Sequence, residues 1–154
     1  MMPKLLTLVV ILILSSLVVS AQECRADNPL VKSARRVAED IVAADNAQDI
    51  SKVLDLYAND AVLMPPNEKL VEGRDTIRPR YESLFANFKP QIIGRVDEVC
   101  VDQKTAFIRG HNGGELIPVS GGEFKKLDDS YLMLLRRDKT GAWRISHLIW
   151  HRSS

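Results

Sequence analysis

Residues 54–66, Leu-Asp-Leu-Tyr-Ala-Asn-Asp-Ala-Val-Leu-Met-Pro-Pro, constrain the fold more than any other stretch of the sequence. A helical pattern ends at Tyr57, Asn59 and Asp60 favour a turn, residues 61–64 can extend as a strand, and two prolines end that strand. At such a corner the side chains of a helix and a strand, here Tyr57 and Met64, can face one cavity. We therefore expect the rest of the chain to form the wall of that cavity.

The order of the periodic segments indicates an α+β fold. Apolar residues at the helical period occupy the first half of the chain. The predicted helices cover residues 33–47 and 50–57, and a third follows Gly73-Arg74-Asp75 and ends at about Phe88. The second half has the composition and period of strands, predicted over residues 91–101, 105–110, 130–137 and 142–151, with a glycine-rich connection over 112–126. Three N-terminal helices followed by a meander predict helices packed on one face of a strongly curved antiparallel sheet.

The first 21 residues have the features of a cleaved secretory signal peptide. Lys4 precedes an uncharged, mostly apolar run, and small residues stand before a cleavage site after Ala21. The run is shorter than the ~20 residues of a membrane-spanning helix, and a retained anchor is the alternative. We expect a signal peptide at 1–21, a tail at 22–32 and a single domain at 33–152. The protein would be secreted, extracellular or periplasmic, with no membrane partner after cleavage.

Charge and cysteine content narrow the partners and the compartment. Lys4 is the one charged residue of the leader, so the rest of the chain has as many basic as acidic residues. No basic cluster stands out, and nucleic acid is not an expected partner, because phosphate contacts need grouped Lys and Arg. In an oxidising compartment Cys24 and Cys100 would form a disulfide that ties the tail to a strand. The alternative is a buried free Cys100 and a loose Cys24.

Four segments of the sequence carry a family resemblance. They are Asn46-Ala47-Gln48-Asp49, Tyr57-Ala58-Asn59-Asp60-Ala61-Val62, Gly73 with Ile77 and Tyr81, and Gly141-Ala142-Trp143-Arg144-Ile145 leading to Trp150. In this order and with these gaps they resemble the nuclear transport factor 2-like superfamily, in its SnoaL-like and ketosteroid-isomerase-like branch. The resemblance covers about residues 34–152 and implies a cystatin-like cone, in which the sheet wraps the helices and leaves a pocket at the wide end. Members include isomerases, dehydratases, epoxide hydrolases and cyclases, and also non-catalytic modules, so the fold does not define the activity.

The residues that ketosteroid isomerase uses are missing at the matching positions. The resemblance places its general-base aspartate at Pro65 and its oxyanion-hole tyrosine at Ile41. Its second donor, a protonated aspartate, falls near Met133, and the nearest acid is Asp129. Neither Pro65 nor Ile41 can carry a proton, so double-bond isomerisation by that mechanism is not expected. Whether the chain is an enzyme stays open.

Other pocket positions of the family are occupied by suitable residues. Tyr57 and Tyr81 match two tyrosines that neighbour the oxyanion site, and Trp150 matches a large aromatic residue on the last strand. Alternation along that strand gives Leu148 and Trp150 the same, concave face. The expected ligand-binding residues are Tyr57, Met64, Tyr81, Phe85, Arg109, Met133, Leu148 and Trp150.

Arg109 and His111 share a face by strand alternation, and the resemblance turns that face to the pocket. A guanidinium in an apolar cavity needs a partner, so one hypothesis is that Arg109 binds a carboxylate of the ligand bidentately. The alternative is an ion pair with an internal acid such as Asp129, or exposure at the rim of the sheet. The catalytic candidates are His111, Tyr57 and Tyr81. For His111 the alternative is a surface or dimer-face position.

Three functions are consistent with the sequence. The first is an exported SnoaL-like domain whose conical apolar pocket binds a small, carboxylate-bearing molecule without catalysis or with weak catalysis. The second is a lyase, isomerase or hydrolase with a non-standard residue set. The third is a dimerisation module, because alternation puts Trp143, Ile145 and Ile149 on the face away from the pocket, which predicts a homodimer. No cofactor is expected, and no metal site, because no Cys, His or Asp cluster has zinc-like spacing.

Overall fold

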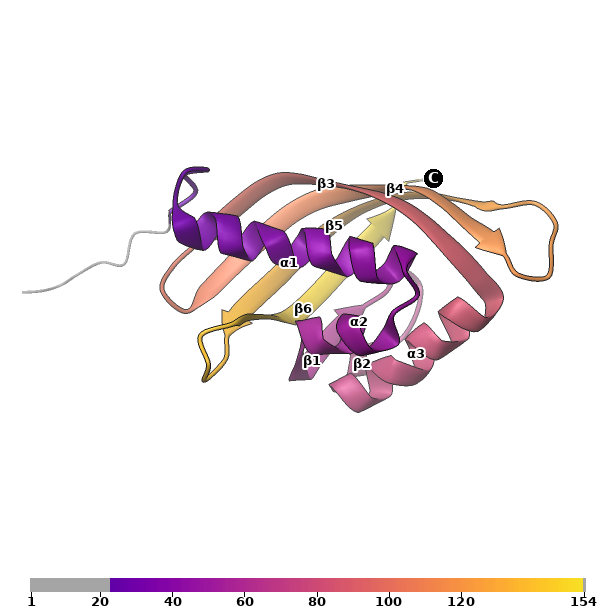
Figure 1. Cartoon of the computed structure of the whole chain (residues 1–154), viewed down its shortest axis with the longest axis horizontal. Helices are drawn as coiled ribbons and strands as arrows, with labels where there is room; N and C mark the ends of the chain where they lie inside the picture. The colour runs from indigo at the N-terminus through magenta and orange to yellow at the C-terminus, as the bar shows by residue number, and fades with distance from the viewer. Residues whose placement is uncertain (1–22, 154) are drawn as a thin grey trace, which may run out of the picture.

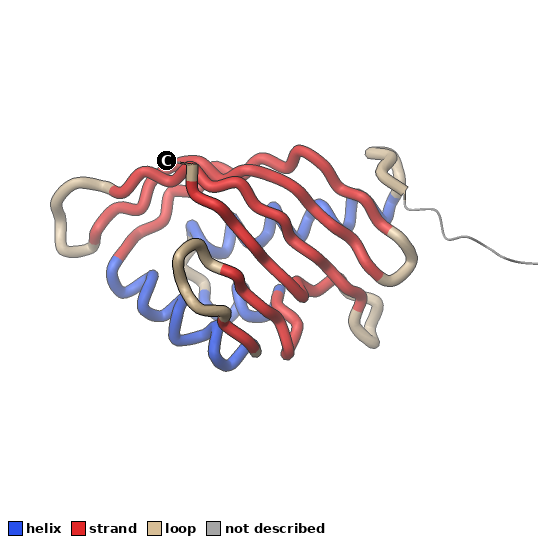
Figure 2. The backbone as a smooth tube through the Cα atoms, turned by 180° about the vertical axis from the view of Figure 1, so that it is seen from behind, coloured by secondary structure: helices blue, strands red, loops and turns tan. Residues whose placement is uncertain are grey.

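Three helices cover one face of a six-stranded sheet in the computed structural model, which describes residues 23–153 (Figures 1 and 2). The helices are α1 (Pro29–Asn46), α2 (Ile50–Leu56) and α3 (Arg74–Asn87). The strands are β1 (Tyr57–Met64), β2 (Val71–Glu72), β3 (Phe88–Val101), β4 (Thr105–Pro118), β5 (Lys125–Arg137) and β6 (Trp143–Arg152). The sequence-based prediction of an α+β fold is confirmed, whereas the expected leader at 1–21 lies outside the described residues.

The sheet is mixed, with strand order β2-β1-β6-β5-β4-β3. Neighbouring strands are antiparallel except β1 and β6, which are parallel. The prediction of an antiparallel sheet is therefore wrong for this pair. The two strands are parallel because the chain passes from β1 through α3 and the β3–β5 meander, which brings β6 back beside β1 in the same direction. Seen from behind, the strands lie in front of all three helices, so no helix of residues 23–153 covers the outer face of the sheet (Figure 2).

The glycine-rich stretch after residue 112 is strand rather than loop. Gly113 pairs with Ile93 of β3, and Gly114 with Ile92, and β4 continues to Pro118. Glycine has a low strand propensity, but hydrogen bonding to the long strands β3 and β5 on either side of β4 outweighs it here. The connection between β4 and β5 is correspondingly short, and it extends beyond the end of α3 (Figure 1).

The segment 46–48, which begins at the last residue of α1, fastens the helix to the sheet and to α3. The Asn46 side chain donates to the Ile92 carbonyl at 2.8 Å and accepts from the Ile92 amide at 2.7 Å. Gln48 donates from Nε2 to the carbonyls of Phe85 and Phe88, at 3.1 and 3.2 Å. Because these bonds fix both ends of the segment, the last turn of α1 is held against β3.

A β-bulge in β6 sets which of its side chains face the helices. Leu134 pairs with His147 but Leu135 pairs with Ile145, so Ser146 is an extra residue. Trp143 and Ile145 before the bulge are therefore buried, at 6% and 0% exposure. The prediction that they face away from the pocket side is wrong, because it assumed strict alternation through the bulge.

The N-terminal tail is tied to the edge of the sheet. Cys24 and Cys100 form the predicted disulfide, with their Cα atoms 4.1 Å apart. Beside it, Glu23 and Val101 exchange backbone hydrogen bonds of 2.7 and 2.8 Å. The tail thereby covers part of β3, which is an edge strand. Within residues 23–153, no helix has the length and apolar character needed to cross a membrane.

Candidate functional site

A cavity of about 650 Å³ lies between the concave face of the sheet, the end of α1 and α3. Leucines from several elements form much of its apolar wall, among them Leu63, Leu84, Leu127 and Leu148. Among its polar groups we distinguish an inner set, Asp45, Tyr57, Tyr81 and Asn112, from a set at the open end, Arg80, Trp150 and Arg152. The side chains of Arg80 and Arg152 are 33% and 54% exposed, whereas Asp129, which binds Arg152, is buried.

Tyr57 and Tyr81 form a hydrogen-bonded pair at the inner end. Their hydroxyl oxygens are 3.0 Å apart, and the two residues are only 1% and 9% exposed. Burial raises the pKa of both hydroxyls well above the usual range, so both keep their protons. Since one hydroxyl proton bridges the pair, the other is free to be donated to another group in the cavity.

Asp45, in the last turn of α1, is an ionisable group without a compensating partner. Its Oδ1 is buried, and no group within residues 23–153 makes a hydrogen bond to it. Burial raises its pKa to about 8, because a charge in a low-dielectric site is disfavoured. The carboxyl is therefore mainly protonated at neutral pH. Its charged form would raise the pKa of both Tyr57 and Tyr81, so the three groups are electrostatically coupled.

Asn112 of β4 has the second buried oxygen that lacks a partner among residues 23–153. It pairs in register with Gly94, and a Cβ on Gly94 would lie 3.4 Å from the Asn112 Oδ1 and 2.9 Å from a methyl group of Val42. The missing side chain of Gly94 thus lets α1 approach the sheet beside Asn112. Asp45 is one helical turn beyond Val42, and both residues that have an unpaired oxygen line the cavity. A protonated Asp45 brings to the cavity a donor that a carboxylate would lack.

The open end of the cavity is lined by two arginines and an aromatic ring. The Arg80 guanidinium carbon lies 5.7 Å from the centre of the Trp150 ring, within cation–π range. Arg80 also donates to Glu68, with 3.1 Å between Nη2 and Oε1. Arg152 donates from Nε to Oδ1 of the buried Asp129 at 3.1 Å.

The cavity contains four of the residues that the sequence suggested for it: Tyr57, Tyr81, Leu148 and Trp150. Phe85 and Met133 are buried in the core instead, and the Phe85 ring packs against that of Tyr81 in a tilted arrangement, with ring centres 5.7 Å apart. Met64 lies at the end of β1 and does not line the cavity. The expectation that Phe85, Met133 and Met64 contact a ligand is not supported by these positions.

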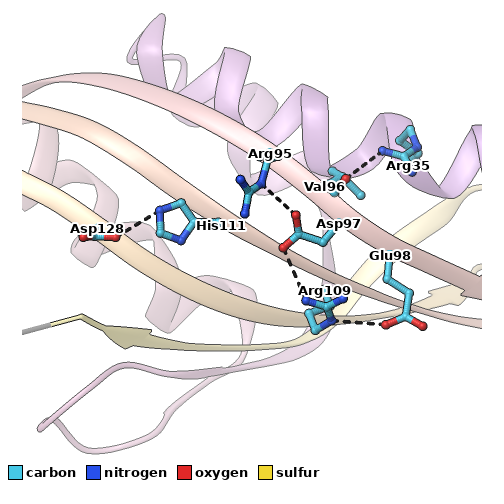
Figure 3. Close-up of polar contacts among 8 residues, drawn as sticks. All are labelled: Arg35, Arg95, Val96, Asp97, Glu98, Arg109, His111 and Asp128. Carbon is cyan, nitrogen blue, oxygen red and sulfur yellow. Dashed lines mark hydrogen bonds and ion pairs between the residues drawn. The ribbon is translucent and has the colours of Figure 1, made fainter.

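Arg109 and His111 lie on the outer face of the sheet, so the prediction that they face the pocket is wrong. Arg109 pairs with Glu98 at 3.2 Å and with Asp97 at 3.5 Å, and His111 Nε2 lies 3.1 Å from Asp128 Oδ1 (Figure 3). The Arg109 side chain is 56% exposed. The structural ion pair considered for Arg109 is therefore present, with Asp97 and Glu98 rather than with Asp129.

Arg109 and His111 do lie on the same face of β4, as predicted from strand alternation. The face of β4 that points inward is the opposite one. Ala106 and Ile108 are 4% and 0% exposed and contact the core, and Gly110 and Asn112 continue that face toward the cavity. The Tyr131 ring of β5 lies against Gly110, where a Cβ would collide with the Tyr131 hydroxyl group and with the Arg95 carbonyl.

The sequence matches a family model described as a SnoaL-like domain over residues 38–143. The chain belongs to the SnoaL-like domain family. A ketosteroid isomerase-like protein from Erwinia carotovora atroseptica has a similar structure, with a TM-score of 0.76 and 26% identity over 82% of this chain and 98% of that one. No curated protein matches the sequence.

Two other solved structures show the same fold at lower identity. One is a protein from Novosphingobium aromaticivorans provisionally named a scytalone dehydratase, with a TM-score of 0.70 and 13% identity over 80% of this chain and 83% of that one. The other is a provisionally named dehydratase of the NTF2-like family from Streptomyces avermitilis, with a TM-score of 0.69 and 15% identity over 80% and 97%. The superfamily resemblance and the predicted fold are thus confirmed.

In this SnoaL-like domain, sequence reasoning missed several polar residues of the cavity, among them Asp45, Arg80, Asn112 and Arg152. A signal existed for Asp45, which follows the buried Ile41 by four residues and so falls on the apolar stripe of α1. Arg152 follows Trp150 by two residues and shares its face. Asn112 had no comparable signal, because its segment did not read as strand. Within residues 23–153, no group of three or more His, Cys, Asp or Glu side chains is arranged to hold a metal ion.

Proposed function

We propose that this SnoaL-like domain binds a small, largely apolar molecule in the cavity and moves a proton on it with Asp45, as a lyase or an isomerase does. The observation that carries the proposal is a carboxyl group whose Oδ1 is buried and unpaired, in a cavity of ligand size that a tyrosine pair also lines. Burial of this group raises its pKa to about 8. An acid–base catalyst works best when its pKa lies near the working pH. A carboxyl kept neutral by its environment can act as a proton donor.

Asp45 has the chemistry for both halves of a dehydration. Protonated Asp45 gives its proton to a leaving hydroxyl group as the C–O bond breaks, and water departs. The resulting carboxylate takes a proton from the neighbouring carbon, a C=C bond forms, and Asp45 is protonated again. The free hydroxyl proton of the Tyr57–Tyr81 pair can polarise a carbonyl group of the substrate and acidify that carbon. A proton shift without loss of water would use the same groups.

Two kinds of comparison favour this proposal. The structural relatives include two provisionally named dehydratases and a ketosteroid isomerase-like protein. In addition, Asp45 lies one helical turn beyond Ile41, the position that corresponds to the oxyanion-hole tyrosine of ketosteroid isomerase. A proton donor on the same face of α1 can serve a ligand in the same region of the cavity.

The test is turnover of small β-hydroxyketones by the purified protein, followed by NMR. Replacing Asp45 with Asn should lower the rate of any conversion by at least ~100-fold, as expected for loss of a general acid or base. Replacing Asp40, an exposed carboxylate on the same helix, with Asn is the matched control and should change little. Wild-type rates in the Asp45 variant, or a carboxyl-carbon NMR titration that puts the pKa of Asp45 near 4, would refute the proposal.

The competing proposal is binding without turnover, with a carboxylate-bearing ligand held in the same cavity. It is supported by the two arginines at the open end, Arg80 and Arg152, which take the place assigned to Arg109 from the sequence. Compounds that bind to the cavity but are recovered unchanged, in the wild type and the Asp45 variant alike, would favour it.

Export and dimerisation belong to the proposal as well. The Cys24–Cys100 disulfide supports an oxidising compartment outside the cytoplasm. A homodimer through the outer face of the sheet is supported by three exposed apolar side chains on it, Leu132, Leu134 and Ile149, which are 40%, 39% and 45% exposed. Sedimentation of the wild type and of a Leu134→Glu variant would test the dimer.

A further inference from the structure

The open end of the cavity already holds one carboxylate, which belongs to the protein itself. Glu68 accepts from both terminal nitrogens of Arg80, at 2.5 and 3.1 Å. The pKa of Glu68 is lowered mainly by the hydrogen bond from Arg80. The positive charges of Arg80 and Arg152 lower it further. Both guanidinium groups therefore act on the same carboxylate, although Arg80 comes from α3 and Arg152 from the end of β6.

We propose that Arg80 and Arg152 form a carboxylate-binding subsite at the open end of the cavity, and that Glu68 occupies it when no ligand is bound. The ligand class is then a small carboxylic acid with an apolar body, oriented with its carboxylate outward and its body toward the inner polar groups. This inference rests on the proposed use of the cavity as a ligand site and specifies which end of the ligand carries the charge.

The two arginines have the donors that such a subsite needs. Arg152 uses only Nε on Asp129, and its two terminal nitrogens make no hydrogen bond within residues 23–153. Arg80 binds Glu68 in the forked geometry that guanidinium groups form with carboxylates. Trp150 also lines the cavity, and the Arg80 guanidinium lies over its ring, which gives a flat apolar surface next to that charge.

Glu68 is suited to be displaced because it lies in a short exposed connection. It follows the Pro65-Pro66 corner and comes before β2, and its side chain is 52% exposed. Asn67 before it adopts φ 60°, a left-handed conformation that asparagine tolerates better than most residues. Exposed ion pairs are weak, so exchange of Glu68 for a ligand carboxylate costs little. Glu68 would act as an internal competitor that lowers the affinity for carboxylates.

The experiment compares 3-phenylpropionate with its neutral amide, 3-phenylpropanamide, by titration calorimetry on the full chain. Replacing Glu68 with Gln should tighten 3-phenylpropionate roughly fivefold and leave the amide within about twofold. Replacing Arg80 or Arg152 with Met, which keeps the apolar stem, should weaken 3-phenylpropionate roughly tenfold but not the amide. Replacing Glu123, an exposed acid in the β4–β5 connection, with Gln is the matched control and should leave both affinities unchanged.

A second measurement needs no variant. In wild-type protein, the side-chain Nε resonances of Arg80 and Arg152 should shift on addition of 3-phenylpropionate and not of the amide. Equal affinity for the two compounds, no tightening in the Glu68 variant, or no binding of 3-phenylpropionate to that variant would each overturn the subsite. None of these results involves proton transfer, so they leave the role of Asp45 untouched. Conversely, a normal pKa for Asp45 would end the catalytic proposal and leave the subsite standing.

Discussion

Replacing Asp45 with Asn should remove most of the pH dependence of stability between about pH 4 and pH 8. Burial raises the pKa of Asp45 from 3.8 to about 8 in the folded protein, whereas the unfolded chain keeps a value near 3.9. Between these two pH values the folded state holds a proton that the unfolded state has released. The free energy of unfolding therefore falls as the pH rises through this interval, and it is not affected by Asp45 below it.

The size of the effect follows from the same two pKa values. Each pH step of one unit inside the interval removes about 1.4 kcal/mol, so the whole interval removes about 5 kcal/mol. That is a large part of the ~5–15 kcal/mol that stabilises a typical domain. Asp138 has the opposite behaviour, because hydrogen bonds, first from Thr140, lower its pKa to about 2. Its contribution is lost only below about pH 4, and it is common to the wild type and the variant.

The assay is urea denaturation from pH 4 to pH 9 with the disulfide intact. The free energy of unfolding of the Asp45→Asn variant minus that of the wild type should rise by about 5 kcal/mol between these limits. The side-chain amide introduced at position 45 can also change the free energy of unfolding by an amount that does not depend on pH. This constant difference does not affect the test, since only the slope with pH is diagnostic. The Asp40→Asn control should run parallel to the wild type. Parallel curves for Asp45→Asn as well would refute the view that Asp45 is a buried, uncompensated carboxyl.

Three further predictions concern other parts of the molecule. Replacing Tyr57 with Phe should cost about 1 kcal/mol in urea denaturation, because it leaves the buried hydroxyl group of Tyr81 without its partner; equal stability would mean that the pair is not formed. Replacing Cys24 and Cys100 together with Ser should cost about 4 kcal/mol, since the disulfide closes a loop with a sequence separation of 76, and an unchanged midpoint would contradict this. Replacing Arg109 with Leu should leave the affinity for 3-phenylpropionate within about twofold, because its guanidinium binds acids on the outer face; a larger loss would return Arg109 to the ligand site.

The architecture was predictable from the sequence, because helical periodicity and the family resemblance depend on many residues at once. The place of Tyr57 and Tyr81 in the cavity was predictable for the same reason, since each tyrosine lies at a well-defined helical or strand position. The inward face of β4 was not predictable from alternation, because Phe107 on one face and Ile108 on the other are both apolar. A shift of one residue moves every side chain to the opposite face, and Arg109 was misplaced in this way.

β-Bulges are the second reason why strand alternation predicted the wrong face for some side chains. Asp97 in β3 and Ser146 in β6 are extra residues in their pairs, and each reverses the alternation that follows. A bulge depends on the partner strand, which is far away in the sequence, so local composition carries no signal for it. In β6 the bulge allows Ile145 to enter the core and Trp150 to reach the cavity from the same face, which strict alternation forbids.

The position of Asp45 follows from how α1 ends. The next residue, Asn46, makes two hydrogen bonds to the backbone of Ile92, so the last turn of the helix cannot rotate to bring Asp45 into solvent. Burial is the main reason for its raised pKa, and the C-terminal end of a helix also disfavours a negative charge. Both effects act on the carboxylate form and neither acts on the acid. Docking of α1 on the sheet and the presence of a neutral acid in the cavity are therefore one structural property, and a change that loosens Asn46 from β3 would alter the protonation of Asp45 without touching the cavity.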